Sequence, residues 1–247
     1  MSVPASTPDD RGVDVLELFD DPVLGGLVKQ ALSMNAGDRM PSERDLATQF
    51  AVSRPTLRDR LGRLESMGLV ERRGGAGTFV KGLSPKTFTE ILTVGMLASG
   101  MTLSSLQVVR LALERQAARE AARAANPVKI AYMAAAVQRM ERTEDPDELY
   151  AADVAFHRAM FDASESPSLI FFADVLSGVI SRSVKERGER IRRLTHDTGV
   201  IRTLHRDLYQ AIYRADVELA DQRVMEHFAW LDLVDGGLAG STGVDPV

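Results

Sequence analysis

Hydrophobic positions near the start of the chain recur at helical spacing and predict three short helices. The first covers residues 22–32, where the leucines, a valine and an alanine share one face. The second begins after Ser42, which forms a variant of the capping box with Asp45. The third begins after Ser53 and ends before Gly68, a residue type that commonly terminates helices.

The pattern then changes to two short strands, over residues 69–72 and 78–80, separated by the glycine-rich turn 74–77. Three helices followed by such a hairpin form a winged helix-turn-helix, which we place at residues 21–82. Residues 1–20 are polar and acidic, do not resemble a signal peptide, and are expected to be a disordered lead-in.

After a boundary at residues 82–85, every periodic segment is helical and nothing is typical of a strand. Pro127, Pro146 and Pro167 each fall where a helix is expected to begin. We therefore expect a second, all-helical domain over residues 83–235 and a disordered tail over 236–247. The helices are predicted over residues 86–98, 103–125, 128–141, 146–164, 168–193, 198–214 and 216–233.

An uncharged run, Ile91–Val109, raises the question of a membrane span. Polar residues and two glycines, Gly95 and Gly100, interrupt it, so we interpret it as a linker and buried helices. The expected location is the cytoplasm, with no membrane partner.

Charge is distributed unevenly along the chain, whose net charge is −5. Residues 37–82 hold nine basic and six acidic residues, so this segment carries +3 and the remainder −8. A basic module attached to an acidic one is consistent with binding of DNA by the N-terminal domain. The chain has no cysteine, so a metal site would have to use His, Asp or Glu.

In a winged helix-turn-helix, the first turn of the second helix of the pair reads DNA bases in the major groove. Here that turn contains Arg54 and Arg58, one turn apart on a single face. Arginine forms bidentate contacts with guanine and also binds phosphate. The alternative is that these arginines only solvate an exposed helical face.

Residues 37–80 resemble the DNA-binding domain of the GntR superfamily, over the continuous string GDRMPSERDLATQFAVSRPTLRDRLGRLESMGLVERRGGAGTFV. The blocks PSERDLA, VSRPTLR and GLVERRGGAGTFV occur in the order and spacing of that family. The resemblance implies contacts with double-stranded DNA from Arg44, Arg54, Thr56 and Arg58, with Ser53 and the wing residue Gly75 nearer the phosphates.

Histidines suggest a site in the helical domain. Asp153 and His157 are spaced i, i+4 on one predicted helix, and His205 and His227 lie on two later helices. Imidazole and carboxylate ligands suit zinc, and also nickel, iron or manganese. From the spacing alone, Asp and His one turn apart on a helix are more often a surface pair or include a core histidine with satisfied hydrogen bonds than a metal site. His196, in a predicted loop, is not expected to be a ligand.

Residues 86–235 resemble the FCD effector domain of FadR-type GntR regulators, through the segments VVRLALERQAAREAA, DVAFHRAMFDAS and HRDLYQAIYRADVELADQRVMEHF. The resemblance implies a mostly α-helical fold, here an antiparallel bundle of six or seven helices. It also implies a divalent transition metal, zinc first, held by Asp153, His157, His205 and His227. Arg110 matches an arginine that binds a carboxylate effector; the alternative is a structural salt bridge to Glu114, one turn away.

Together these observations predict a transcriptional regulator, most simply a repressor, that binds a palindromic operator as a homodimer. A small carboxylate bound beside the metal would modulate its affinity for DNA, and the chain itself would not be an enzyme. Two alternatives are a metal-dependent hydrolase or isomerase fused to a DNA-binding head, and a metal-free FCD regulator of a bulky acyl ligand.

Overall fold

The computed structural model describes residues 15–82, 84–101, 105–178 and 199–235. The chain divides into two compact units, Met1–Thr87 and Phe88–Val247. The division falls within the first turn of a helix that follows the expected linker at residues 82–85.

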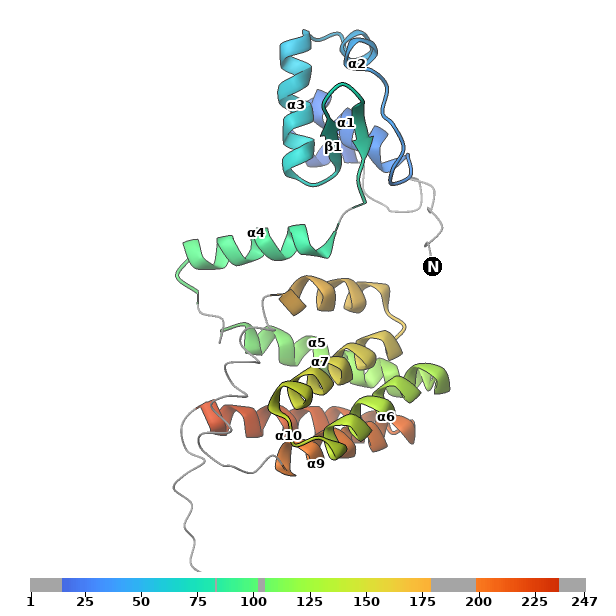
Figure 1. Cartoon of the computed structure of the whole chain (residues 1–247), viewed down its shortest axis with the longest axis vertical. Coiled ribbons are helices and arrows are strands. Elements are labelled where there is room, and N and C mark those ends of the chain that lie inside the picture. The colour runs from blue at the N-terminus through green and yellow to red at the C-terminus, as the bar shows by residue number, and fades with distance from the viewer. Residues whose placement is uncertain (1–14, 83, 102–104, 179–198, 236–247) are drawn as a thin grey trace, which may run out of the picture. The chain divides into compact units, whose positions relative to one another are not determined.

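The N-terminal unit contains three helices and a two-stranded sheet (Figure 1). These elements are α1 (Pro22–Leu32), α2 (Glu43–Gln49), α3 (Arg54–Ser66), β1 (Val70–Arg73) and β2 (Gly77–Val80). The strands are antiparallel, with Val70 opposite Val80. This is the predicted winged helix-turn-helix.

Local hydrogen bonds at the helix ends agree with the sequence pattern. Ser42 Oγ accepts a hydrogen bond from the Asp45 N–H at 3.2 Å, and Ser53 Oγ accepts one from the Thr56 N–H at 3.3 Å. Both side chains therefore satisfy amide groups that the first helical turn leaves without partners. Gly68 follows α3 with φ +76°, a left-handed conformation that favours glycine at this position.

A leucine-rich core holds the three helices together. Leu27, Leu46, Leu57, Leu61 and Leu64 are fully buried in one cluster. Burial of the leucines of α3 fixes the rotation of this helix, so its opposite face, with the arginines, is exposed.

Regular structure begins earlier in the chain than the sequence pattern predicts. Val15–Leu18, inside the expected lead-in, forms a short 3-10 helix that contacts α1, and Phe19 packs against the same core. Residues 1–14 and the expected tail, 236–247, lie outside the described residues.

The C-terminal unit is helical throughout its described residues, as predicted. Its elements are α4 (Pro85–Ala98), which begins in the other unit, α5 (Leu106–Ala124), α6 (Pro127–Arg142), α7 (Pro146–Ala163), a helix described over residues 167–178, α9 (Gly199–Tyr213) and α10 (Val217–Asp235). The prolines at 127, 146 and 167 each stand at the first position of a helix.

Small residues allow the helices of this unit to approach closely. α5 packs against α7 and α10, and α6 packs against α7 and α9 (Figure 1). Their shared core is rich in alanine, with Ala118, Ala152 and Ala211 completely buried, and methionines fill the remaining space. This packing brings α5, α7, α9 and α10 around one interior region.

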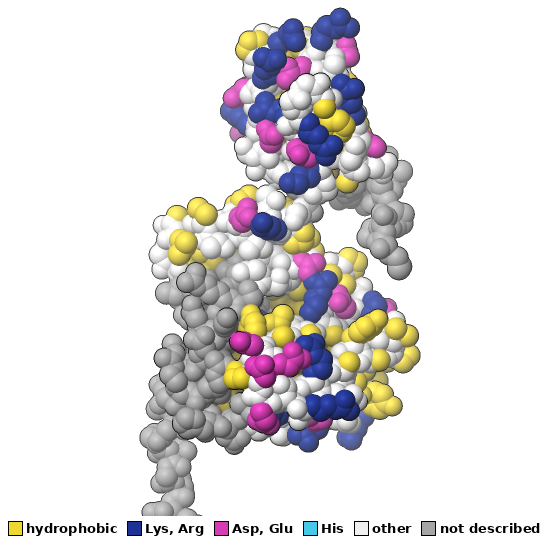
Figure 2. Space-filling view, in the orientation of Figure 1, with side chains coloured by type: hydrophobic (Ala, Val, Ile, Leu, Met, Phe, Trp, Pro, Cys, Tyr) yellow, Lys and Arg dark blue, Asp and Glu magenta, His cyan; other side chains and the backbone are white. Residues whose placement is uncertain are grey.

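The expectation that the run Ile91–Val109 forms buried helices is wrong for part of it. On one face of α4, Ile91, Val94 and Leu97 are 61%, 66% and 71% exposed. Figure 2 shows hydrophobic side chains on the surface in the region of this helix. The reason is that α4 contacts its own unit through the opposite face, where Met96 is buried. Among the described helices, none is both long and apolar enough to cross a membrane.

Candidate functional sites

Three histidines from three different helices meet in the interior of the C-terminal unit. His157 lies on α7, His205 on α9 and His227 on α10, and all three are buried. One ring nitrogen from each belongs to a set in which all atoms lie within 4.8 Å of one another. The structure therefore brings together three of the four ligands expected from sequence, and His196 lies outside the described residues.

Asp153, one turn before His157, completes the group. Its Oδ1 lies 3.0 Å from His205 Nε2 and 3.7 Å from His157 Nε2, and the two Nε2 atoms are 3.3 Å apart. Donor atoms about 2.1 Å from one ion, at tetrahedral or octahedral angles, lie roughly 3.0–3.4 Å apart. The spacing of these three donors is close to that required for a shared metal ion.

The outward-facing nitrogens of two histidines have the partners that metal-binding histidines usually have. His205 Nδ1 lies 2.7 Å from the Ile201 carbonyl oxygen, and His157 Nδ1 lies 2.8 Å from Glu114 Oε2. With the proton on each Nδ1, both Nε2 lone pairs face each other and the Asp153 carboxylate, the arrangement in which they can share a metal ion. Without a metal, His205 Nε2 can instead donate a hydrogen bond to Asp153 Oδ1.

The electrostatics of the cluster also favour the metal-binding forms. Burial among the other two histidines holds the pKa of His227 well below its ordinary value, so this ring is neutral. Burial raises the pKa of Asp153, but its hydrogen bond with His205 and the nearby histidine charges outweigh this effect. The pKa of Asp153 is therefore lowered, and its carboxyl group is ionised.

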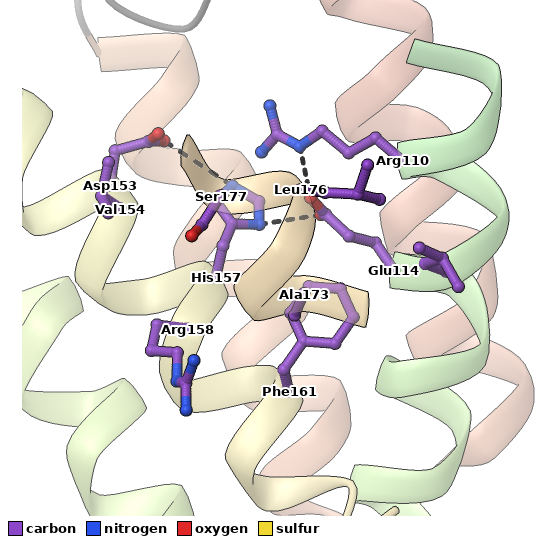
Figure 3. A pocket seen from close by; sticks show the side chains of 11 residues that line it. Arg110, Glu114, Asp153, Val154, His157, Arg158, Phe161, Ala173, Leu176 and Ser177 are labelled. Atoms are coloured by element: carbon purple, nitrogen blue, oxygen red, sulfur yellow. Dashed lines mark hydrogen bonds and ion pairs between the residues drawn. The ribbon is translucent and has the colours of Figure 1, made fainter. Parts of the chain in front are cut away.

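A cavity of about 90 Å³ opens beside this cluster, between α5, α7 and the helix over residues 167–178 (Figure 3). Its polar end is formed by Asp153, His157 and Arg110, together with Glu114. The cavity therefore joins the candidate metal ligands to the candidate carboxylate-binding arginine.

Arg110 makes the salt bridge that the sequence offered as an alternative, but this uses only part of its side chain. Its Nε donates a hydrogen bond to Glu114 Oε1 at 2.5 Å, and both side chains are buried. The two terminal nitrogens turn away from Glu114 (Figure 3) and have no hydrogen-bond partner among the described residues. Burial raises the pKa of Glu114, but the charges of Arg110 and then His157 outweigh it and lower the pKa to about 2.

Glu114 was expected only as a salt-bridge partner, and its second role came from the tertiary structure. One carboxylate oxygen holds Arg110 and the other faces His157, so Glu114 connects the arginine to the histidine cluster. The i, i+4 spacing of Arg110 and Glu114 was visible in the sequence; the approach of α7 to Glu114 was not.

On the N-terminal unit, the candidate DNA-reading residues lie on an exposed surface that also carries other basic side chains (Figure 2). Arg54 stands at the first position of α3, with no ion pair to any described residue, and Arg44 on α2 is exposed. Ser53 and Thr56 bond to each other across the helix start, at 2.8 Å between their hydroxyl oxygens. Gly75, with φ +73°, lies in the turn between the strands, and no atom stands within 4 Å of where a Cβ would be.

Arg58 differs from Arg54 because a carboxylate holds it. Its Nε donates a hydrogen bond to Glu43 Oε2 on α2 at 2.7 Å. This ion pair joins the two helices of the helix-turn-helix and fixes the direction of Arg58 on the reading face.

Comparison with known protein families agrees with both units. Residues 105–229 match the FCD domain, and residues 30–80 match the family described as bacterial regulatory proteins, gntR family. The chain belongs to the GntR family, in the group with a C-terminal FCD domain.

Three relatives each match more than three quarters of the chain. The chain is 28% identical over 207 residues to the HTH-type transcriptional regulator LutR of Bacillus subtilis, covering 83% of this chain and 94% of that protein. It is 28% identical over 208 residues to a candidate regulatory protein of the L-lactate dehydrogenase operon of Escherichia coli, covering 81% and 78%. It is also 28% identical over 197 residues to the transcriptional repressor NanR of Salmonella newport, covering 77% and 74%.

A solved structure supports the fold. The chain superposes on a GntR protein of Streptococcus agalactiae with a TM-score of 0.60 at 21% identity, covering 87% of this chain and 97% of the other. The protein is accordingly a transcriptional regulator with a DNA-binding helix-turn-helix and an FCD domain, and its relatives are regulators, not enzymes.

Proposed function

We propose that this regulator is a repressor whose affinity for DNA is controlled by a small carboxylate bound beside a metal ion in the FCD domain. The observation that carries the proposal is the shared cavity, which is lined by Asp153 and His157 of the cluster and by Arg110, whose terminal nitrogens have no partner among the described residues. A guanidinium group binds a carboxylate through two parallel hydrogen bonds, and a metal supplies a second point of attachment.

The metal would be held by Asp153, His157, His205 and His227. Three imidazole nitrogens and one carboxylate oxygen suit zinc, with nickel, iron and manganese as alternatives that accept the same types of ligand. When bound, the metal would contribute positive charge and an open position for a carboxylate oxygen. The protein's own contribution is to orient the ligands through Glu114 and the Ile201 carbonyl group.

A ligand in this cavity can influence α4 through the helix over residues 167–178. Ala173, Leu176 and Ser177 of this helix line the cavity. Its other contacts reach α4: Val175 O accepts a hydrogen bond from Thr89 Oγ1 at 2.6 Å, and Phe171 packs edge-on against Phe88. The first residues of α4 belong to the DNA-binding unit. A displacement of the helix over residues 167–178 that moves α4 would therefore be transmitted along the chain to that unit.

This path from the cavity to α4 predicts that Thr89→Val weakens the effect of the carboxylate on the affinity for DNA while leaving carboxylate binding unchanged. Loss of one hydrogen bond, worth about 0.5–1.5 kcal/mol, should reduce the carboxylate-induced change in operator affinity by about 2- to 10-fold. Fluorescence anisotropy with labelled operator, with and without carboxylate, measures the change. The matched control is Thr93→Val, because among the described residues the Thr93 hydroxyl bonds to a carbonyl oxygen of its own helix, that of Thr89. Operator affinity that responds to no carboxylate in the wild-type protein would contradict the effector mechanism itself.

We further propose that the protein binds a palindromic operator as a homodimer, since two-fold protein symmetry matches two-fold operator symmetry. In each subunit, Arg54 and Arg58 would read bases, Arg44 and Thr56 would also contact the DNA, and Ser53 and Gly75 would lie nearer the phosphates. The exposed position of Arg54 at the start of α3 supports this assignment.

Arg54→Ala should weaken binding to the operator by about 1–3 kcal/mol per site, or roughly 5- to 150-fold. Binding to unrelated DNA should change much less, because a base contact is made only on the specific sequence. Anisotropy titrations with both DNAs at one salt concentration measure the ratio. Arg63→Ala, on the same helix but in its last turn, serves as the control. An equal loss on both DNAs would make Arg54 a phosphate contact.

The alternative of a bulky acyl ligand receives little support from the size of the cavity, about 90 Å³. The alternative of a fused hydrolase or isomerase receives none from the relatives, which are transcriptional regulators.

A further inference from the structure

A short segment before α2 pairs with the wing of the N-terminal unit. The Met40 N–H donates a hydrogen bond to the Thr78 carbonyl oxygen at 2.9 Å, and Arg39 lies opposite Phe79 in an antiparallel bridge. The backbone of Arg39 is therefore fixed along β2, although this residue precedes α2 and α3 in the chain.

The alternation of side chains along β2 places Arg39 on the outer face of the wing. Thr78 and Val80 are buried, whereas Gly77 and Phe79 point to the opposite side of the strand. Because directly opposed residues of an antiparallel pair point to the same side, Arg39 shares the outer face with Phe79. Its side chain is exposed.

The guanidinium group of Arg39 lies over Gly77, at the end of β2 next to the glycine-rich turn. A Cβ at this glycine would stand 2.9 Å from Arg39 Nε and 3.2 Å from one terminal nitrogen, so any other residue type would displace the arginine. The turn between β1 and β2 and the start of α3 point toward the same end of the N-terminal unit (Figure 1). The charge of Arg39 is thus directed toward the end of this unit that contains the candidate DNA-reading residues.

Most of the basic side chains in this unit are already paired with carboxylates. Among the basic residues of segment 37–82, ion pairs with described residues are made by Arg44, Arg58, Arg60, Arg63, Arg72 and Arg73. Arg39 makes none with any described residue. Glu71, which lies opposite Phe79 on the outer face, is paired with Arg73 at 3.0 Å. The charge of Arg39 therefore remains available to an anion.

From this arrangement we infer that Arg39 binds a DNA phosphate beside the wing, and that the glycine at position 77 permits this placement. A phosphate is favoured over a base because base edges lie at the floor of grooves about 7.5–8.5 Å deep, whereas this guanidinium group lies against β2. The inference depends on the binding of DNA by the N-terminal unit. It is independent of the metal, of the carboxylate and of base reading by Arg54.

Arg39→Gln tests the contact, because it removes the charge of an exposed side chain and keeps most of its length. Each phosphate contact contributes about 0.9 to the slope of log K against log salt concentration, so the slope should become shallower by about this amount for each bound subunit. The loss of affinity should then be about 3.5-fold larger at 50 mM than at 200 mM salt for each subunit. Fluorescence anisotropy with a short labelled duplex of arbitrary sequence measures both quantities.

The matched control is Arg63→Gln, which also removes one arginine charge from this unit. Arg63 lies in the last turn of α3, where it pairs with Asp59. Its replacement should leave the slope close to that of the wild-type protein. A second duplex, selected by the wild-type protein from a random library, extends the comparison to specific DNA. Arg39→Gln should weaken binding to both duplexes by the same factor, because phosphates carry no sequence information.

Gly77→Ala tests the placement of the guanidinium group without changing the charge. The added methyl group has to displace Arg39, so it should weaken DNA binding by about twofold or more in the wild-type background and by much less in the Arg39→Gln background. Since Gly77 has φ +113°, alanine there can also distort the wing, but such a distortion would cost the same factor in both backgrounds.

The possible outcomes are distinct. A shallower slope with equal losses on the two duplexes supports the phosphate contact. A slope that changes no more than in Arg63→Gln overturns it, and so does a loss confined to the selected duplex, which would make Arg39 a base contact. An equal effect of Gly77→Ala in both backgrounds overturns the role of the glycine. Base reading by Arg54 is tested separately by Arg54→Ala and can hold or fail with either result.

Discussion

Replacing His205 with alanine should reduce bound metal from about one ion per chain to nearly none, because the proposed four-ligand site would lose a donor that lies close to two of the others. His205 Nε2 is the atom nearest to both other measured donors, 3.0 Å from Asp153 Oδ1 and 3.3 Å from His157 Nε2. Inductively coupled plasma mass spectrometry on the purified protein measures the content.

Removal of the metal should also lower stability. A ligand present at 1,000 times its Kd stabilises the folded state by about 4 kcal/mol. For a chain of this size that corresponds to roughly 8–16 °C in Tm. A chelator should therefore lower the Tm of the wild-type protein by that amount and leave the Tm of His205→Ala unchanged. Comparing each protein with and without chelator removes the packing cost of the substitution itself.

His196→Ala is the control for this prediction, because the sequence places His196 outside the metal pattern. The variant should keep both the metal and the response to chelator. Full metal content in His205→Ala, or a wild-type Tm that no chelator changes, would show that the histidine cluster is only a buried core.

Arg110→Met should have the second-largest effect, on stability and on carboxylate binding together. Glu114 is buried, and without Arg110 the polar side chain left beside it would be that of His157. Breaking a buried ion pair from one side costs about 3–5 kcal/mol. Loss of the charged hydrogen bonds to a carboxylate should weaken its binding by about 1.5–3 kcal/mol, or roughly 10- to 150-fold. Urea unfolding and calorimetry measure the two effects.

The two roles of Arg110 separate in the double variant Arg110→Met with Glu114→Gln. Replacing the carboxylate with an amide removes the unpaired charge, so part of the stability should return, while carboxylate binding should stay weak. Recovery of carboxylate binding in the double variant would show that Arg110 only balances Glu114.

The pH dependence of the Arg110→Met variant follows from the pKa of Glu114. In the wild type this pKa is about 2, below the ordinary 4.5, so the stability it contributes is present above pH 4.5 and is lost as the pH falls toward 2. Without Arg110 the effect of burial should raise this pKa. The stability deficit of the variant should therefore be largest near pH 7 and become smaller below pH 4.5, where Glu114 takes up a proton.

Much of the fold was readable from the sequence because it depends on neighbours along the chain. Ser42 and Ser53 cap the helices that follow them, Gly68 ends α3, and the prolines stand at helix starts. These effects act within about one helical turn, so residue order alone determines them. The placement of Arg54 and Arg58 on one face, one turn apart at the start of α3, likewise depends only on residue order.

The exposed face of α4 was not predicted correctly from neighbouring residues alone. Ile91, Val94 and Leu97 follow a helical hydrophobic pattern, yet they are exposed in this chain because α4 packs through its other face. Periodicity shows that a helix has an apolar face but does not identify what covers it.

By itself, the sequence determined the winged helix-turn-helix, the helical second domain and the residue types available for a metal. Only the tertiary structure decided that His157, His205 and His227, from three helices, point to one place, and that Glu114 joins them to Arg110. The physical reason is that helix-helix packing sets distances between residues far apart in the chain, through side-chain volumes that no short pattern encodes. The cavity beside the histidine cluster arises in the same way, from three elements that meet only after folding.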